Sequence, residues 1–144
     1  MWQQEHKGQW GDVEWHKIGE FEPDGFYVTG IPRDVTAIEN VANISINEIV
    51  CAASLFSVPP NENCSRRVAA SSWSCTNQGI TYHRLVLMDG EATIPGDSGG
   101  PWFIATRAYG STKGTCETGP LNQDMFSVAD LYQEALGVQV KITP

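Results

Sequence analysis

The decapeptide IPGDSGGPWF at residues 94–103 concentrates an acidic residue, a hydroxyl and three glycines within five positions. Glycine adopts backbone conformations, including positive φ, that other residues rarely adopt, so such a loop can aim two amide N–H groups at one point. Donors arranged in this way stabilise the oxyanion of an acyl-transfer intermediate. The sequence therefore predicts an oxyanion hole formed by the N–H groups of Gly96 and Ser98, with Ser98 as the nucleophile. Asp97 is assigned a structural role, holding the loop by a local hydrogen bond or ion pair.

The simpler interpretation of this stretch is a glycine-rich turn between two strands. A bare G-x-S-x-G pattern would leave that interpretation competitive. The longer string GDSGGPWF is more specific, because each of its positions has to match and a strand-like aromatic run follows at once.

Short strands separated by turn residues fill most of the chain. The predicted strands are residues 25–30, 34–38, 44–46, 48–56, 65–72, 80–88, 101–110 and 125–128. Several short strands at intervals of roughly 8–12 residues favour a β-sandwich or a β-barrel. Only residues 129–136 have a helical pattern, and Gly137 follows as the expected stop. We expect an all-β fold with a short C-terminal helix, in one compact unit.

The composition argues against several classes of function. The chain has a formal net charge of −8 and a pI near 4.7, whereas a nucleic-acid-binding face needs clustered lysine and arginine. No apolar run approaches the roughly 20 residues that span a bilayer, so no membrane partner is expected. The first ten residues show no apolar segment of the signal-peptide type.

The four cysteines show neither a C-x-x-C pair nor a histidine at zinc-finger spacing, so no metal site is predicted. Their even number suits two disulfides, which implies an oxidising compartment. Four buried free thiols are the alternative.

The string GDSGGP resembles the nucleophile signature of the chymotrypsin-like serine peptidases, and its surroundings are similar to the bacterial, streptogrisin-like branch. The likeness extends from about Trp10 onward. It implies a chymotrypsin-like antiparallel β-barrel, the second of a two-barrel fold, with residues 1–24 carrying the aspartate strand and residues 25–144 forming the barrel and helix. Four further features match in order: DVEWH at 12–16, the cysteines of IVCAAS and ENCSRRV, AYGSTKG at 108–114 and FSVADLYQEALGV at 126–138.

The resemblance implies a Ser–His–Asp mechanism in which Ser98 attacks a peptide carbonyl and Asp12 orients the histidine. In this family the histidine lies upstream of the aspartate, in the first barrel, and that stretch is missing here. His16 follows Asp12 in the same strand, which places it roughly 13 Å further along. His6 is expected in a mobile terminal segment, and His83 is expected to be a surface or half-buried structural residue. The isolated chain is therefore predicted to be inactive or nearly so.

The resemblance also implies a substrate pocket. In trypsin-like members an acidic residue six positions before the nucleophile selects Arg or Lys, and Ala92 stands at that position. A small neutral residue there favours an apolar or small side chain at the cleavage site. Lys113 and Gly114 fall on the strand that lines the groove. Asp89 and Glu91 lie close enough that a small shift in alignment would reverse this preference, although a solvated acidic turn is the preferred interpretation of both.

The resemblance pairs the cysteines as well. Cys51 and Cys64 are similar to the cysteines that open the strand hairpin of the second barrel, and closing this short loop would add roughly 3 kcal/mol in the chain-entropy model. Cys116 resembles one partner of another family disulfide, and Cys75 is the remaining cysteine. A Cys75–Cys116 disulfide is the resulting hypothesis, and it requires Cα atoms within about 7 Å of each other.

The sequence thus predicts a serine endopeptidase domain of a secreted, extracellular protein, acting on a polypeptide substrate and needing no cofactor. A groove left open by the missing N-terminal barrel is expected to be covered by that barrel or by another chain. Trp2, Trp10 and Trp15 are candidates for this apolar surface, and ordinary core positions are an equal alternative. The alternative function is an inactive trypsin-like pseudoenzyme or a peptide-binding module. An unrelated β-domain is not favoured, because the other segments match in order.

Overall fold

A computed structural model describes residues 1–16, 25–28, 31–54 and 61–144 of the chain. Most of the regular structure in these residues is β-strand, as the sequence predicts. The strands are β1 (Trp2–Gly8), β2 (Gly11–His16), β3 (Gly25–Val28), β4 (Ile31–Asp34), β5 (Ala37–Ile38), β6 (Cys51–Ser54), β7 (Asn61–Asn63), β8 (Val68–Asn77), β9 (Ile80–Met88), β10 (Pro101–Ile104), β11 (Arg107–Gly114) and β12 (Met125–Val128). The helical elements are two 3-10 turns, η1 (Val41–Asn43) and η2 (Ala129–Leu131), and the helix α1 (Tyr132–Leu136).

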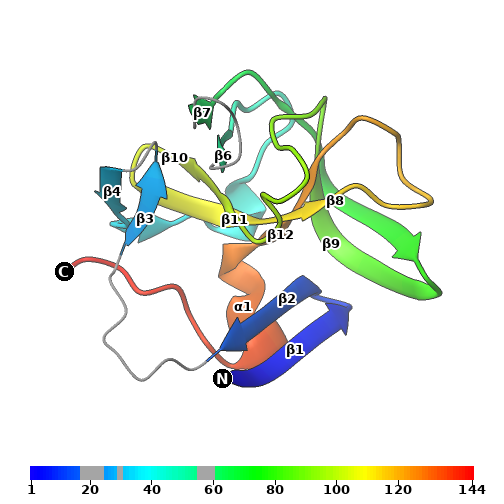
Figure 1. Cartoon of the computed structure of the whole chain (residues 1–144), viewed down its shortest axis with the longest axis horizontal. Helices are drawn as coiled ribbons and strands as arrows, with labels where there is room; N and C mark the ends of the chain where they lie inside the picture. The colour runs from blue at the N-terminus through cyan, green and yellow to red at the C-terminus, as the bar shows by residue number, and fades with distance from the viewer. Residues whose placement is uncertain (17–24, 29–30, 55–60) are drawn as a thin grey trace.

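One large sheet forms the body of the molecule. Its antiparallel strands run in the order β7-β6-β10-β11-β12-β9-β8, and β5 pairs with β11 in parallel. The hairpins β1–β2 and β3–β4 are separate two-stranded sheets. Figure 1 shows the β1–β2 hairpin and α1 together at one end of the sheet, with β6 and β7 at the other. The N-terminal hairpin therefore borders one end of this sheet.

The centre of the core is an aromatic pair from two sheet strands. Trp102 of β10 and Phe126 of β12 are fully buried, and their rings stack with centroids 5.2 Å apart. Every residue of β12 is buried, which is typical of a central strand covered on both faces. The next residue of β10, Phe103, points to the opposite face and packs on Phe26 of β3.

The two predicted disulfides are present. Cys51–Cys64 links β6 to the segment after β7, with Cα atoms 4.2 Å apart. Cys75–Cys116 joins β8 to the segment after β11, with Cα atoms 6.2 Å apart, inside the limit set for this hypothesis. The expectation of paired cysteines is confirmed, and the alternative of free thiols is wrong.

Several predicted elements match closely. Residues 80–88 and 125–128 form β9 and β12. The helical pattern at 129–136 becomes η2 followed by α1, and Gly137 ends the helix with φ of 70° while its N–H donates to the Gln133 carbonyl. Residues 65–72 were expected to be a strand, and β8 begins later and runs on to Asn77.

Other predicted strands are wrong or divided. Residues 44–46 follow η1 and form no strand, because the Ile44 N–H closes that turn on Val41 and Ile44 alone faces the core. Residues 34–38 are divided between the end of β4 and β5, and 101–110 is divided by the turn between β10 and β11. The predicted strand ends at 29–30 and 55–56 lie outside the described residues.

Among the described residues, no helix has both the length and the apolar composition needed to cross a bilayer.

Replacing Phe126 with alanine is expected to destabilise the fold strongly. Phe126 is fully buried against Trp102, and removing a buried aromatic ring costs about 3–5 kcal/mol. Urea unfolding of Phe126→Ala measures this loss of free energy of unfolding. Ile46→Ala is the matched control, since Ile46 is 62% exposed and surface changes stay within about 0.5 kcal/mol. Equal effects of the two substitutions would contradict this account of the core.

Candidate active site

The loop that carries Ser98 is folded tightly on itself. The Asp97 N–H donates to the Ile94 carbonyl at 3.0 Å, and the Gly100 N–H donates to the Asp97 carbonyl at 2.9 Å. Gly96 has φ of 106°, in the region that favours glycine. Gly100 admits no side chain, because a Cβ there would lie 2.8 Å from the Asp97 carbonyl oxygen. The glycine crowding in the sequence is therefore required by the turn.

Asp97 holds this loop through its side chain. Its carboxylate is buried, 5% exposed, and Oδ2 accepts a hydrogen bond from the Ile94 N–H at 3.0 Å. The local hydrogen bond expected from the sequence is thus present, and no cation pairs with Asp97 among the described residues.

Thr112 of β11 fixes the same loop to the sheet. Its carbonyl accepts from the Gly99 N–H at 3.0 Å, and its N–H donates to the Gly100 carbonyl at 2.9 Å. Its hydroxyl donates to the same carbonyl at 3.1 Å and accepts from the Trp102 indole at 3.0 Å. The chain directly after Ser98 is therefore held against β11.

The Ser98 hydroxyl is exposed on this rigid support. It forms no hydrogen bond with another residue in the part of the chain that the structure describes. The N–H groups of Gly96 and Ser98 also have no acceptor among the described residues. The loop thus presents a hydroxyl beside two available backbone donors, which is the arrangement that an oxyanion site needs.

Asp12 lies on β2, which is joined to the sheet by Ser127 of β12. The Asp12 N–H donates to Ser127 Oγ at 2.9 Å, and Ser127 Oγ donates to the Asp12 carbonyl at 3.1 Å. The Asp12 carboxylate accepts from the Lys113 ammonium at 2.9 Å. The side chain of Lys113 is only 7% exposed and that of Asp12 is 26% exposed. Lys113 was predicted to line the substrate groove, and its charged end lies on Asp12.

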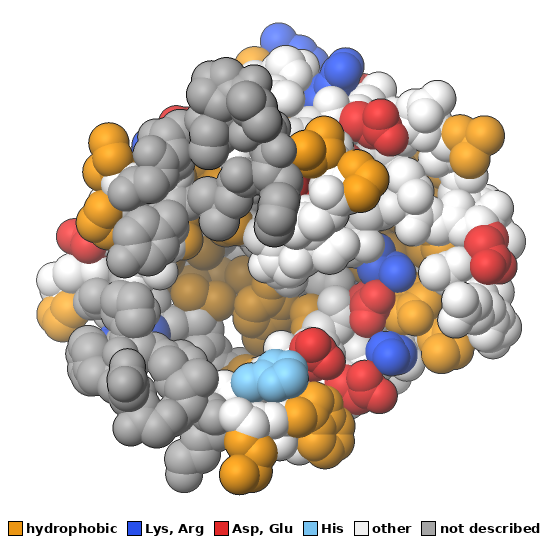
Figure 2. Space-filling view, viewed as in Figure 1, with side chains coloured by type: hydrophobic (Ala, Val, Ile, Leu, Met, Phe, Trp, Pro, Cys, Tyr) orange, Lys and Arg blue, Asp and Glu red, His pale blue; other side chains and the backbone are white. Residues whose placement is uncertain are grey.

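Ser98, Asp12 and Lys113 line one open cavity of about 1020 Å³. Figure 2 shows a hollow on this face, with hydrophobic side chains around its floor and charged and histidine side chains at its rim. Part of the apolar lining comes from Trp15 of β2 and Leu136 of α1. Trp2 is 54% exposed, whereas Trp10 is partly buried below the Arg84 guanidinium.

None of the three histidines forms a hydrogen bond with Ser98 among the described residues. His6 lies in β1 opposite Val13, and its Nε2 accepts from the Trp10 N–H at 3.1 Å. The mobility expected for this segment stays a prediction. His83 is exposed and its Nδ1 is 2.8 Å from Ser74 Oγ, a surface position as predicted.

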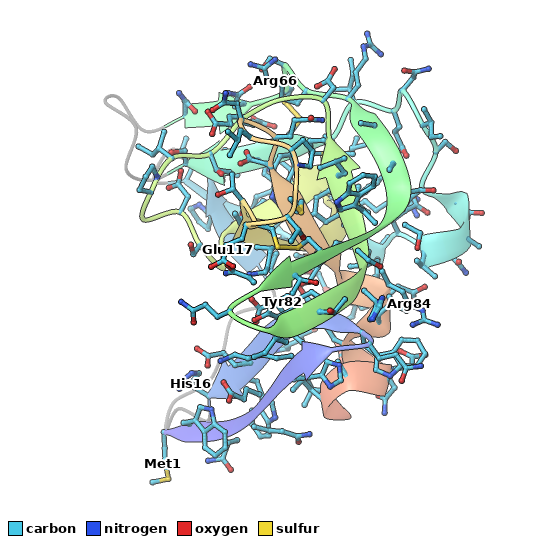
Figure 3. The ribbon with its side chains drawn as sticks, turned by 90° about the vertical axis from the view of Figure 1, so that its right-hand side faces the viewer. Met1, His16, Arg66, Tyr82, Arg84 and Glu117 are labelled. Carbon is cyan, nitrogen blue, oxygen red and sulfur yellow. A yellow bond between two sulfur atoms is a disulfide. The ribbon has the colours of Figure 1, made fainter. Side chains whose placement is uncertain are left out.

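His16 lines the cavity, but its Nε2 lies 3.2 Å from the Glu14 carboxylate. Figure 3 shows His16 near Met1 at the open end of the hairpin, opposite the end beside Arg84. Within the described residues, the hydrogen bonds and ion pairs of the three histidines are therefore made with groups other than Ser98.

A second buried carboxylate, Asp124, holds the segment that leads into the Ser98 loop. Its Oδ2 accepts from the Ala92 N–H at 2.7 Å, the Thr93 N–H at 2.9 Å and the Thr93 hydroxyl at 3.0 Å. Asp124 is 3% exposed. Sequence reasoning missed this residue because nothing in its neighbourhood marks it, and only the fold brings it to Ala92.

The predicted pocket residues have different surroundings. Ala92 is buried, and Gly114 ends β11 with φ of 87°. Asp89 is exposed and accepts from the Arg67 N–H, and Glu91 is exposed beside Arg66. These contacts agree with a solvated acidic turn. The preference for small or apolar side chains at the cleavage site stays a prediction.

One grouping of possible metal-ligand atoms occurs among the described residues, formed by Cys51, Cys64 and Glu62. Both sulfurs are joined in a disulfide, and a disulfide sulfur lacks the thiolate charge that binds a metal. This grouping is therefore no metal site.

No protein-family model matches the chain, and no curated protein matches its sequence. Solved structures do match. One is described as a glutamic-acid-specific serine protease that uses a histidine triad in substrate binding, with a TM-score of 0.68 and 16% identity over 94% of this chain and 72% of that one. The chymotrypsin of Cellulomonas bogoriensis matches with a TM-score of 0.66 and 22% identity over 90% of this chain and 68% of that one.

The fold is thus chymotrypsin-like, as the resemblance of the GDSGGP string implies. The structural neighbours are serine proteases, and the likeness at these identities establishes the fold of this chain.

Raising the pH above 10 is expected to destabilise the protein through Tyr132, which lines the cavity. Burial raises the pKa of Tyr132 to about 12, and its hydrogen bond to Ser111 acts in the opposite direction. Because the folded pKa lies above the unfolded value near 10, this contribution is complete below pH 10 and is lost between pH 10 and 12. Tyr132→Phe should therefore lose less free energy of unfolding than the parent chain between pH 10 and 12.

Tyr109 provides the internal comparison, because burial and its hydrogen bonds to Glu48 and Glu39 also raise its pKa. The Tyr132→Phe variant should therefore keep the part of the alkaline destabilisation that Tyr109 causes. A stability profile identical to that of the parent chain above pH 10 would refute the assignment to Tyr132.

Removing the Asp124 carboxylate is expected to release the segment before Ser98. Asp124→Ala leaves the N–H groups of Ala92 and Thr93 without their acceptor, and each unsatisfied buried donor costs about 1–3 kcal/mol. Amide hydrogen exchange at these two positions should accelerate and the free energy of unfolding should fall. Asp89→Ala is the control, since Asp89 is exposed in the neighbouring turn. Unchanged exchange at Ala92 in Asp124→Ala would contradict the role of this carboxylate.

Proposed function

We propose that the chain is a serine endopeptidase domain in which Ser98 and Asp12 belong to a Ser–His–Asp site, and that a partner polypeptide supplies the histidine. The observation that carries this proposal is the Ser98 loop. Ser98, with its exposed hydroxyl, lines the cavity that Asp12 also lines. The N–H groups of Gly96 and Ser98 in the same loop have no acceptor among the described residues.

The chemistry that this geometry supports is acyl transfer. The carbonyl oxygen of a peptide bond would lie against the Gly96 and Ser98 N–H groups, which gain strength as negative charge develops on that oxygen. Ser98 Oγ would then attack the carbonyl carbon and has to lose its proton. A serine hydroxyl is a weak nucleophile without an adjacent base, and no histidine of this chain contacts Ser98 among the described residues.

The partner polypeptide would cover the open cavity. Its lining combines apolar side chains such as Trp15 and Leu136 with ionised ones, and the Trp15 Nε1 atom is buried with no hydrogen-bond partner among the described residues. A polypeptide such as a first barrel, or another chain, would cover this apolar surface and bring a histidine to it. The two disulfides are consistent with an extracellular location.

The second candidate function is a catalytically inactive peptide-binding module. The observation that favours it is the contact of Lys113 with the Asp12 carboxylate at 2.9 Å, which places a cation where a Ser–His–Asp site needs an imidazole. In this case the groove would bind a peptide without cleaving it.

Labelling of Ser98 by a fluorophosphonate tests the endopeptidase proposal. The serine oxygen forms a bond to phosphorus, fluoride leaves and a base takes the hydroxyl proton. In the chain alone the reaction is expected to be slow, since loss of the histidine costs on the order of 10⁶-fold in a complete triad. Its rate should rise with pH through the neutral range without levelling off, because a complete site levels off above a histidine pKa of about 7.

Ser98→Ala should abolish the label. Ser74→Ala is the matched control, because Ser74 already lies 2.8 Å from a histidine ring nitrogen but has no glycine loop beside it. A label lost in Ser74→Ala and kept in Ser98→Ala would refute the assignment. A plateau near neutral pH would show that a base is present, and peptide binding with no label at any pH would favour the binding module.

A further inference from the structure

We propose that Lys113 is the counter-ion of the Asp12 carboxylate. Its ion pair with Asp12 prevents an imidazole from binding there and acting as the base for Ser98. This inference rests on the proposed function, in which Asp12 is the partner of a supplied histidine. It assigns to Lys113 a positioning role that acts through Asp12, in place of the substrate contact predicted from the sequence.

The backbone of β11 turns Lys113 toward Asp12. Thr112 pairs with Phe126 of β12 and Gly114 pairs with Met125, the next residue along, so β11 has one residue more than its partner at this point. Lys113 is that extra residue. A bulge of this kind re-aims a side chain, and Gly114 has the positive φ of 87° that follows it.

The ammonium is enclosed on several sides. Lys113 Nζ lies 2.9 Å from Asp12 Oδ2 and 4.3 Å from the centroid of the Tyr82 ring. With 7% of its side chain exposed, Lys113 is poorly screened by water, so its pair with Asp12 is stronger than a surface ion pair. Figure 3 shows Tyr82 close to the β1–β2 hairpin, on which Asp12 is carried.

Lys7 provides a contrast on the same hairpin. It is the cross-strand neighbour of Asp12 in β1, yet its ammonium pairs with Glu5 at 3.1 Å and is 43% exposed. The pKa of Lys7 is raised chiefly by its hydrogen bond to Glu5, with a smaller effect of Asp12. Two lysines thus stand near one carboxylate, and only Lys113 contacts it directly within the described residues.

The consequence concerns charge in the transition state. In a Ser–His–Asp site the aspartate orients the imidazole and stabilises the imidazolium that forms when the serine proton is taken. A protonated lysine on the same carboxylate neutralises it and repels that imidazolium. Lys113 itself is no substitute base, because an ammonium has three donors and no acceptor.

Free imidazole is the probe that tests this inference. Fluorophosphonate labelling of Ser98 is followed as imidazole is added, with imidazole accepting the serine proton. We expect little acceleration in the parent chain. In Lys113→Met the acceleration should be about tenfold or more, a fraction of the ~10⁴ that the aspartate contributes to complete triads.

Two further variants separate direct contact from net charge. Lys7→Met removes an equal charge near Asp12 without removing the ion pair and should behave as the parent chain. The double variant Asp12→Asn, Lys113→Met should again show little acceleration of labelling by imidazole. Equal acceleration by imidazole in the parent chain and in Lys113→Met would overturn the inference.

A second measurement does not depend on the reactivity of Ser98. The amide signal of Asp12 in ¹H–¹⁵N spectra should move with imidazole in Lys113→Met and stay in place in the parent chain. An equal movement in both would overturn the role of Lys113. If Ser98 is labelled in no variant while the Asp12 signal behaves as expected, the endopeptidase proposal fails, and the part of the inference that stands is that Lys113 keeps imidazole from the Asp12 carboxylate.

The same spectra show whether each variant is folded. Lys113→Ser is the second substitution if the Lys113→Met chain does not fold, because a small hydroxyl leaves room for water beside the exposed part of Asp12.

Discussion

The hydrogen bonds between Thr112 and the turn at 99–100 determine where Ser98 lies. They join the loop after Ser98 to β11 through two backbone bonds and one side-chain bond. The buried Trp102 indole donates a further hydrogen bond to the Thr112 hydroxyl. Since β11 is itself paired with β10 and β12, the position of the loop is set by the sheet. A serine on a free glycine-rich turn would have no such support.

The same strand also places a charged side chain against the Asp12 carboxylate. Thr112 points into the core, and the bulge at the next residue sends Lys113 to the hairpin that carries Asp12. The hairpin is held in turn by Ser127 of β12, which bonds both the N–H and the carbonyl of Asp12. Two adjacent strands therefore fix the serine loop, the aspartate and the lysine at once, so a shift in the β11–β12 register would disturb all three.

The sequence predicts much of this because its signals are local. The glycines and the buried Asp97 are required by one tight turn, β9 and β12 are rich in apolar residues, and Gly137 ends the helix by its own conformation. What sequence reasoning missed depends on distant pairing. Asp124 reaches Ala92 only in the folded sheet. The resemblance places Lys113 on the strand that lines the groove, and Lys113 does line the cavity. Its contact with Asp12 was not predicted, because the order of residues gives no sign of the bulge that turns this side chain.

The contact of Lys113 with Asp12 also stabilises the folded state, because it compensates the charge of a partly buried carboxylate. A carboxylate that is three-quarters covered, with 26% of its side chain exposed, loses hydration and needs a compensating partner. In a complete Ser–His–Asp site the imidazole N–H provides one. No histidine of this chain contacts Asp12 among the described residues, so without another cation the folded state would contain a poorly compensated charge. Lys113 supplies that cation, and the residue that stabilises the hairpin is therefore the one that opposes an imidazole at the same carboxylate.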